Sequence, residues 1–252
     1  LYAYAHEILG DFDIALDSYE KSILLYGDTK EGAFSYSGRG HVYDLMGEKD
    51  KALSDYNKAL ELDSGLDIAL LGRARVYAFQ EDFESAISDI EKLFTSTVDS
   101  RTFAEALQVY GSINLVQGDY ALAKSHFEKS IEYDNKFTQS LVGLAKASLH
   151  QILFEEIKFD DKDSADAFAV EIMSYAERAL EIHPYQTSAH VVIAEIYTYY
   201  YGDYDEARKI YDNVMMNIVG NDITLGALEK DIMRSVIKKE LERINTLEQN
   251  GF

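Results

Sequence analysis

The sequence contains no cysteine, a single proline and no run of eighteen or more apolar residues. The absence of cysteine excludes disulfides, thiolate chemistry and CxxC metal sites, and it leaves the compartment open, although the cytoplasm is favoured. Without a long apolar run, no membrane-spanning helix is expected. One proline in 252 residues is typical of a chain that is almost entirely helical.

Positive charge is also scarce. The chain has 24 lysines and arginines against 45 aspartates and glutamates, for a net charge of -21. Binding to phosphate backbones needs basic side chains gathered on one surface, and an acidic field repels a polyanion. We therefore expect no nucleic-acid partner and no attachment to an anionic membrane surface. Apolar residues make up 47% of the chain, which is enough to bury a continuous core.

Signatures of catalysis and cofactor binding are missing too. No two of the six histidines form an i, i+4 pair with a nearby glutamate, as in a zinc protease, and no glycine-rich phosphate loop or GxSxG motif is present. Asp161 and Asp163 alternate like the start of a calcium loop, but the glycine and the closing glutamate of such a loop are lacking. We predict a protein that is not an enzyme and has no cofactor and no metal.

An internal repeat is the strongest signal in the chain. A corner residue is followed by a small residue after five positions, a bulky apolar residue four later, and another small or apolar residue three later. The sets are Gly10, Ala15, Tyr19, Ser22; Gly47, Ala52, Tyr56, Ala59; Glu81, Ala86, Ile90, Leu93; Gly118, Ala123, Phe127, Ser130; and Gly202, Ala207, Tyr211, Val214. Steps of four and three place each set on one buried face of a helix.

A second helix is indicated upstream of each corner. It has a small residue seven positions before the corner and usually an aromatic residue four before it. The pairs are Gly40 with Tyr43, Ala74 with Tyr77, Gly111 with Asn114, and Ala194 with Tyr197, the last with its corner delayed by one residue. Small residues let two antiparallel helices touch, so each corner is predicted to join such a pair.

The repeats resemble those of the tetratricopeptide-repeat superfamily. Residues 32–64 look like one such repeat, and the corners Gly10, Gly47, Glu81 and Gly118 are 37, 34 and 37 residues apart, against a typical period of 34. The extra length is assigned to the loops at 26–31 and 95–101. The resemblance implies an all-α fold, an α-solenoid in which antiparallel helix pairs form a right-handed superhelix.

Residues 1–214 are interpreted as about six helix-pair repeats. The first repeat is truncated, and because the chain starts at Leu1, part-way into a repeat, we expect a fragment or processed form. The fifth carries an insertion at about 153–167, with an acidic turn at 160–163 and Asp163 or Ser164 capping the next helix.

Residues 215–252 are predicted to form a C-terminal capping segment. A polar-faced helix of this kind closes the core of a repeat array. Its apolar stripe comprises Leu228, Ile232, Val236, Ile237, Leu241 and Ile244. The alternative is that this helix docks onto a partner or a second copy.

In the superfamily, the first helix of each unit lines a concave groove that takes a peptide. The resemblance maps this groove to Phe34, Ser37, His41, Ile68, Leu71, Arg75, Glu105, Gln108, Ser112, Gln139, Val142 and Lys146. The Lys and Asn pair with which some chaperone-docking members hold a C-terminal carboxylate is missing from these positions. Arg75 and Lys146 put a cation on this face and are the best candidates for partner contacts, unless they pair with acidic residues of adjacent units.

The resulting hypothesis is a non-catalytic scaffold or adaptor that binds a protein or peptide partner in its groove. Two alternatives stay open. One is a structural subunit of a larger assembly or a homo-oligomer, using the terminal helix and the tyrosine cluster Tyr197, Tyr199, Tyr200, Tyr201 and Tyr204. The other is a regulatory domain of a larger protein.

Overall fold

The computed structural model describes residues 2–96, 99–154, 159, 161–222, 225 and 227–249. Every regular element within these ranges is helical, so the predicted all-α class is confirmed. The chain divides into two compact units. Unit 1 comprises residues 1–110 with 226–228, and unit 2 comprises residues 111–225 with 229–252.

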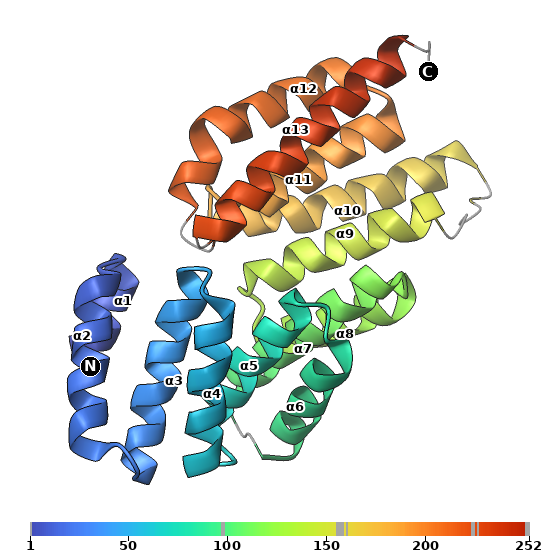
Figure 1. Ribbon diagram of the computed structural model, residues 1–252. Coiled ribbons are helices and arrows are strands. Elements are labelled where there is room, and N and C mark those ends of the chain that lie inside the picture. The colour runs from blue at the N-terminus through green and yellow to red at the C-terminus, as the bar shows by residue number, and fades with distance from the viewer. Residues whose placement is uncertain are drawn as a thin grey trace. The chain divides into compact units, whose positions relative to one another are not determined.

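Unit 1 is built from consecutive helices that turn back on one another. They are α1 (Tyr2–Leu9), α2 (Phe12–Tyr26), α3 (Lys30–Leu45), α4 (Lys49–Leu62), α5 (Asp67–Phe79), α6 (Phe83–Ser96) and the first part of α7 (Ser100–Gln117). Each helix from α1 to α5 packs against its successor, and α3 also touches α5 (Figure 1). This adjacency is that of stacked helix pairs.

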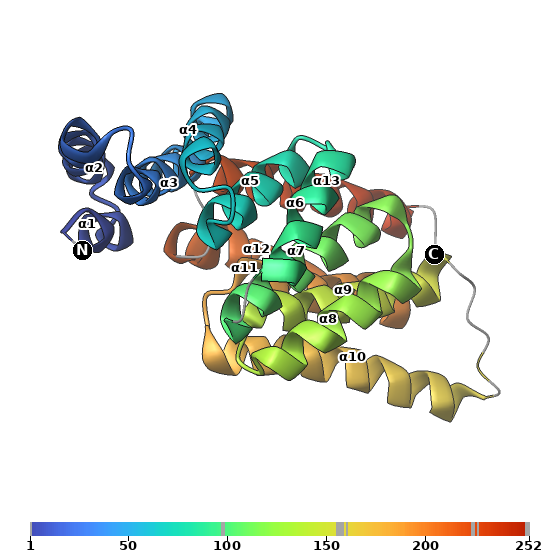
Figure 2. The ribbon, with the colours of Figure 1, turned by 90° about the horizontal axis from the view of Figure 1, so that it is seen from below.

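Unit 2 continues with longer helices. They are the end of α7, then α8 (Tyr120–Tyr133), α9 (Thr138–Phe154), α10 (Lys162–Ile182), α11 (Thr187–Ile196), α12 (Tyr204–Asn213) and α13 (Ala227–Gln249). Two π-helical turns, η1 (Tyr197–Tyr201) and η2 (Val214–Ile218), and a 3₁₀ turn, η3 (Val219–Asn221), follow α11 and α12. The long α10 lies beside α9 (Figure 2).

The predicted repeat boundary at residue 214 falls inside a helical stretch, because η2 and η3 extend α12 to Asn221. Beyond it, α13 lies along α11 and α12 (Figure 1). Its Ile237 and Ile244 are fully buried in a core cluster with Val191 and Tyr211. Part of the apolar stripe of α13 therefore covers this core. Leu228, Ile232 and Val236 of the same stripe stay partly exposed.

The corners have the backbone conformation that their residues favour. Gly10, Gly47, Gly118 and Gly202 have φ between 65° and 81°, and the one corner without glycine, Glu81, has φ 62°. The backbone N–H of Asp82, directly after Glu81, donates to the carbonyl of Tyr77. In the same way, the backbone N–H of Asp119, directly after Gly118, donates to the carbonyl of Asn114. These bonds are those of a Schellman motif, which ends a helix through one left-handed residue.

Acidic residues directly after the corners start the following helices. Asp82, Asp119 and Asp203 each accept a hydrogen bond from the backbone N–H three residues ahead, at 3.0–3.2 Å. In the fifth repeat the cap is Asp161, whose carboxylate accepts from the Ser164 N–H at 2.8 Å. The prediction of Asp163 or Ser164 as this cap is wrong, because Asp161 can both adopt the extended cap conformation and reach the free N–H. Asp160 lies outside the described residues.

The predicted stripes are buried. The small residues five positions after the corners are all inaccessible to solvent, and most of the bulky residues four positions later are buried as well. These residues are Ala15, Ala52, Ala86, Ala123 and Ala207, and Tyr56, Ile90, Phe127 and Tyr211. Close packing of this alternation of small and large side chains holds each helix pair together.

Glycines receive the large aromatic residue of the preceding pair. A Cβ atom at Gly38 would lie 2.3 Å from the Tyr19 ring, one at Gly72 would lie 2.4 Å from the Tyr56 ring, and one at Gly143 would lie 2.5 Å from the Phe127 ring. No other residue allows the ring to approach the helix backbone so closely. Gly38 and Gly72 each stand nine residues before a corner.

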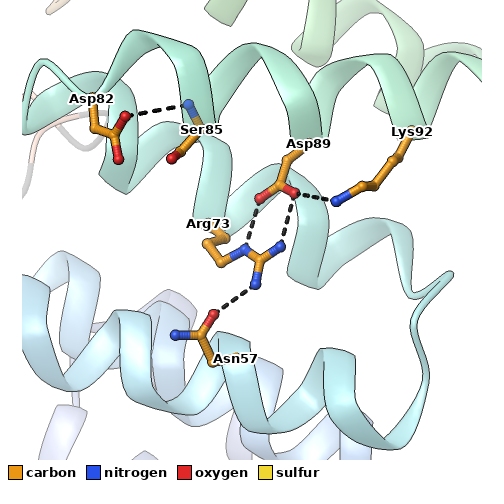
Figure 3. Close-up of polar contacts among 6 residues, drawn as sticks. All are labelled: Asn57, Arg73, Asp82, Ser85, Asp89 and Lys92. Carbon is orange, nitrogen blue, oxygen red and sulfur yellow. Dashed lines mark hydrogen bonds and ion pairs between the residues drawn. The ribbon is translucent and has the colours of Figure 1, made fainter.

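Two arginines tie consecutive helices together. Arg73 of α5 donates to both carboxylate oxygens of Asp89 in α6, and its third nitrogen donates to the Asn57 amide oxygen of α4 at 2.6 Å (Figure 3). Arg39 of α3 makes the same bidentate bond to Asp55 of α4. Charge-assisted bonds of this geometry fix both distance and orientation between neighbouring helices.

The delayed sixth corner has a local cause. Helix α11 passes into the π-helical turn η1, which accommodates one extra residue before Gly202. The tyrosines of this turn differ in their hydrogen-bond partners and in their exposure. Tyr200 donates to Asp166 and Tyr199 donates to Glu240, while Tyr201 is 43% exposed.

Candidate functional site

A cavity of about 440 Å³ opens on unit 1. Helix α3 contributes Phe34, Ser37, Gly38 and His41 to its lining, and α5 contributes the residues 34 positions later in the chain. Those residues are Ile68, Leu71, Gly72 and Arg75. The steps of three and four within each set put all of its members on one face of a helix, and the repeat brings the two faces next to each other. We call this space the unit 1 cavity.

The rest of the lining comes from other helices. Tyr4 of α1, Tyr19 of α2, Tyr56 of α4 and Glu105 of α7 complete it. The rings of Tyr19 and Tyr56 rest on Gly38 and Gly72, so the close aromatic–glycine contacts of the fold also shape the wall of this cavity.

The cavity combines exposed apolar residues with one free cation. Phe34 and Ile68 are 56% and 49% exposed, whereas Ser37 and Leu71 are buried. Arg75 is exposed and makes no ion pair with another described residue of the chain. Glu105 is held by Arg101 at 3.1 Å instead. The geometry therefore suits a ligand that covers apolar surface and carries a negative charge.

The structure brings seven of the twelve predicted groove residues together in this one cavity. They are Phe34, Ser37, His41, Ile68, Leu71, Arg75 and Glu105. Gln108, Ser112 and Gln139 are partly buried outside it, and Val142 is buried in the core around Leu141 and Ile172. Tyr4, Tyr19, Tyr56, Gly38 and Gly72 were not predicted. Of these residues, the two glycines had a signal in the sequence, because Gly38 and Gly72 are 34 positions apart.

Lys146 lines a different cavity, of about 470 Å³, in unit 2. Its walls come from α9, from α11 with η1, and from α13. The lining residues are Lys146, Leu149, His150, Leu153, Phe154, Glu195, Tyr199, Val236, Glu240 and Arg243. We call this space the unit 2 cavity. Sequence reasoning could not find it, because α13 approaches α9 from about ninety positions further along the chain.

Glu195 is the unusual member of this lining. Its side chain is 9% exposed, and its Oε2 atom has no hydrogen-bond partner among the residues that the structure describes. Burial raises the pKa of this carboxyl, against the opposing charge of Lys146. A buried carboxylate oxygen without a partner is costly and rare.

The groups around Glu195 are engaged with one another. Tyr199 donates to Glu240, and the Arg243 guanidinium lies over the Tyr199 ring, 5.0 Å from its centroid. Burial and the Glu240 bond raise the pKa of Tyr199. Burial, with Lys146 nearby, lowers the pKa of His150 to about 4. His150 is thus neutral at physiological pH.

Within the described ranges, no helix has both the length and the apolar character needed to cross a membrane.

Comparisons with known proteins agree with the repeat pattern. The family model described as "Tetratricopeptide repeat" matches residues 33–66 and 104–137. Human "Tetratricopeptide repeat protein 34" is 24% identical over 186 residues, which cover 74% of this chain and 28% of that protein. Human "DnaJ homolog subfamily C member 7" is 30% identical over 86 residues, covering 34% of this chain and 17% of that protein. The chain thus matches only a minor part of each relative.

Solved structures share the fold at low sequence identity. A monomeric mutant of IFIT1 with Gppp-AAAA has a TM-score of 0.71 at 14% identity, covering 95% of this chain and 52% of that one. PilW, a type IV pilus biogenesis factor, has a TM-score of 0.65 at 14% identity, covering 85% of this chain and 90% of that one. At this identity the likeness concerns the α-solenoid fold alone.

Proposed function

Because this chain belongs to the tetratricopeptide-repeat superfamily, we propose that it is a non-catalytic interaction scaffold that binds a segment of a partner protein in the unit 1 cavity. One observation carries the proposal: two repeat-related helix faces place exposed Phe34 and Ile68 beside Arg75, a cation that no described residue neutralises.

The chemistry of the cavity defines the segment. Apolar side chains would cover Phe34, Ile68 and Leu71, and burial of such surface supplies most of the binding free energy. A carboxylate of the segment would lie at Arg75. A cavity of about 440 Å³ accepts a few side chains, so the expected ligand is a short apolar segment with at least one acidic group.

A protein partner is favoured over a nucleic acid. The net charge of -21 repels phosphate backbones, and Arg75 alone cannot offset it in the unit 1 cavity. The similarity to IFIT1 with Gppp-AAAA is one of fold and carries no ligand across. Self-association through the tyrosine cluster is less favoured, because Tyr199 and Tyr200 are already hydrogen-bonded within unit 2.

Selection of peptides from a random library tests the proposal. Peptides that bind the wild-type chain are measured by isothermal titration against Arg75→Glu and Phe34→Ala. Each variant is expected to weaken binding tenfold or more, with unchanged melting. Lys30→Glu is the control, since it changes the net charge equally at a 71% exposed residue outside the cavity. Selected peptides that bind Arg75→Glu and Phe34→Ala as well as wild type would refute the site.

A further inference from the structure

We propose that the unit 2 cavity is a second binding site, which takes a basic side chain, lysine or arginine, of a partner segment and pairs it with the carboxylate of Glu195. This site is separate from the unit 1 cavity and does not depend on the function proposed for that cavity.

Glu195 has unfilled hydrogen-bonding capacity inside the unit 2 cavity. Its side chain is buried, it lines the cavity, and no described residue donates a hydrogen bond to its Oε2 atom. A carboxylate only accepts hydrogen bonds, so the missing partner is a donor, and an ammonium or guanidinium supplies a donor together with the opposite charge. Burial of the unpaired Glu195 carboxylate costs free energy in the free protein, and a hydrogen-bonding cation that enters the cavity lowers this cost.

The lining of the unit 2 cavity combines exposed apolar residues with the buried Glu195. Phe154 and Val236 at the lining are 64% and 39% exposed, while Glu195 is 9% exposed. Leu149 and Leu153 add apolar wall to the same lining. Lysine and arginine have a long apolar stem and a charged head, so their stem would contact these walls while the head reaches the carboxylate.

Two cationic side chains, Arg243 and Lys146, also line the unit 2 cavity. Arg243 is exposed and lies over the Tyr199 ring, and Lys146 is not within ion-pair distance of a described carboxylate. These two could instead hold an anion. The buried atom without a partner, however, belongs to a carboxylate, and the net charge of -21 draws basic segments toward the chain and repels acidic ones.

Methyl NMR on the 252-residue chain tests the site. The probes are N-acetyl-lysine amide and N-acetyl-arginine amide. N-acetyl-norleucine amide, which has the stem without the charge, and N-acetyl-glutamate amide serve as comparisons. The lysine and arginine probes are expected to shift the methyl resonances of Leu149, Leu153 and Val236 in a saturable way, at least tenfold more tightly than the norleucine probe. Binding is expected to weaken as salt is added.

Two variants and one control test whether the shifts of the methyl resonances come from binding at Glu195 in the unit 2 cavity. Glu195→Gln keeps the size of the side chain and is expected to weaken the lysine probe tenfold or more. Glu177→Gln, an exposed residue on α10, removes the same charge from the chain and is expected to leave binding unchanged. Val236→Trp at the partly exposed rim is a second variant, expected to block the probe by narrowing the mouth.

The proposal is overturned if the basic probes leave these methyl groups unshifted, if Glu195→Gln binds them like wild type, or if the glutamate probe binds more tightly than they do. Methyl resonances of Ile68 and Leu71 report on the unit 1 cavity in the same spectra. A peptide response there without a response at Leu149 would reject this second site and leave the proposed function standing.

Discussion

The guanidinium of Arg73 meets the carboxylate of Asp89 with two nearly parallel hydrogen bonds, of 2.7 and 2.8 Å, sixteen residues apart in the chain (Figure 3). Asp89 is 2% exposed, and the Asn57 amide oxygen of the preceding helix pair accepts from the same arginine. Arg39 and Asp55 repeat this arrangement one helix pair earlier. Each arginine therefore joins the two helices of its own pair, and Arg73 also reaches the preceding pair, through side chains that the apolar pattern does not include.

Replacing Arg73 by alanine is expected to lower the free energy of unfolding by about 3 kcal/mol, because it leaves the buried Asp89 carboxylate without its main partner. Urea denaturation measures the loss. Arg75→Ala, two residues away and exposed, is the control and is expected to change stability by less than about 0.5 kcal/mol. Equal effects of the two substitutions would contradict the role assigned to the pair.

Glu81→Gly is expected to stabilise the chain by about 0.5–1 kcal/mol. Glu81 has φ 62°, a conformation that costs a residue with a Cβ atom about 1–2 kcal/mol and costs glycine little, while the flexible unfolded glycine offsets part of the gain. Thermal and urea unfolding measure the change.

The reverse substitution at another corner is its control. Gly118→Ala places a Cβ atom in nearly open space at φ 81°, so backbone strain alone is expected to destabilise it by about 1 kcal/mol. If both substitutions leave stability unchanged, the corner conformation does not govern the glycine preference.

Gly72→Ala is expected to cost about 1–3 kcal/mol, because its Cβ atom would lie 2.4 Å from the Tyr56 ring and force that ring to move. Tyr56 lines the unit 1 cavity, so peptide binding there should weaken as well. Gly65→Ala is the matched control, since no atom that the structure describes lies within 4 Å of its new Cβ atom. A Gly72→Ala chain as stable as the Gly65→Ala chain would show that the ring contact is not needed.

Glu195→Gln is expected to stabilise the chain at neutral pH but not in acid. The folded-state pKa of Glu195 is raised above its ordinary value of 4.5 by burial. Below that value the carboxyl is protonated in both the folded and the unfolded state, so ionisation carries no cost. As the pH rises above 4.5, the unfolded chain ionises first, and the contribution of Glu195 to stability falls until the folded-state pKa is passed.

The difference in melting temperature between Glu195→Gln and wild type, followed from pH 4 to pH 8, measures this effect. It is expected to be near zero at the acid end and to grow with pH. His150, with a pKa of about 4, titrates in both proteins and so contributes equally to each curve. A flat difference for Glu195→Gln would mean that this carboxyl ionises normally.

Much of the repeat fold could be predicted from local pattern. The corners were located by the spacing of small and large residues, and all five have positive φ. The small residues at Ala52 and Ala123 are fully buried, as their positions on the helix faces indicated. These features depend on residues close in the chain, such as Gly47 and Ala59, and the same pattern recurs in each repeat, which makes it recognisable.

The candidate sites could be predicted only in part. Phe34 and Ile68 occupy equivalent positions on successive repeats, as do His41 and Arg75, and a 34-residue period makes this visible, so their shared cavity follows from the repeat. Lys146 was placed on the same kind of surface, but it faces α13, and no repeat signal indicates where a helix outside the repeats will pack.

By itself, the sequence determined the all-α class, the helix pairs and their corners, since backbone conformation and the buried face of a helix depend on nearby residues. Only the tertiary structure decided that Asp89 would be paired with Arg73, that Gly38 and Gly72 would receive tyrosine rings, and that Glu195 would be buried beside α13. Burial and pairing are properties of contacts between helices. The free energy of each such contact depends on residues that are distant in the chain. The amino-acid sequence alone does not show which face of a helix another helix will cover.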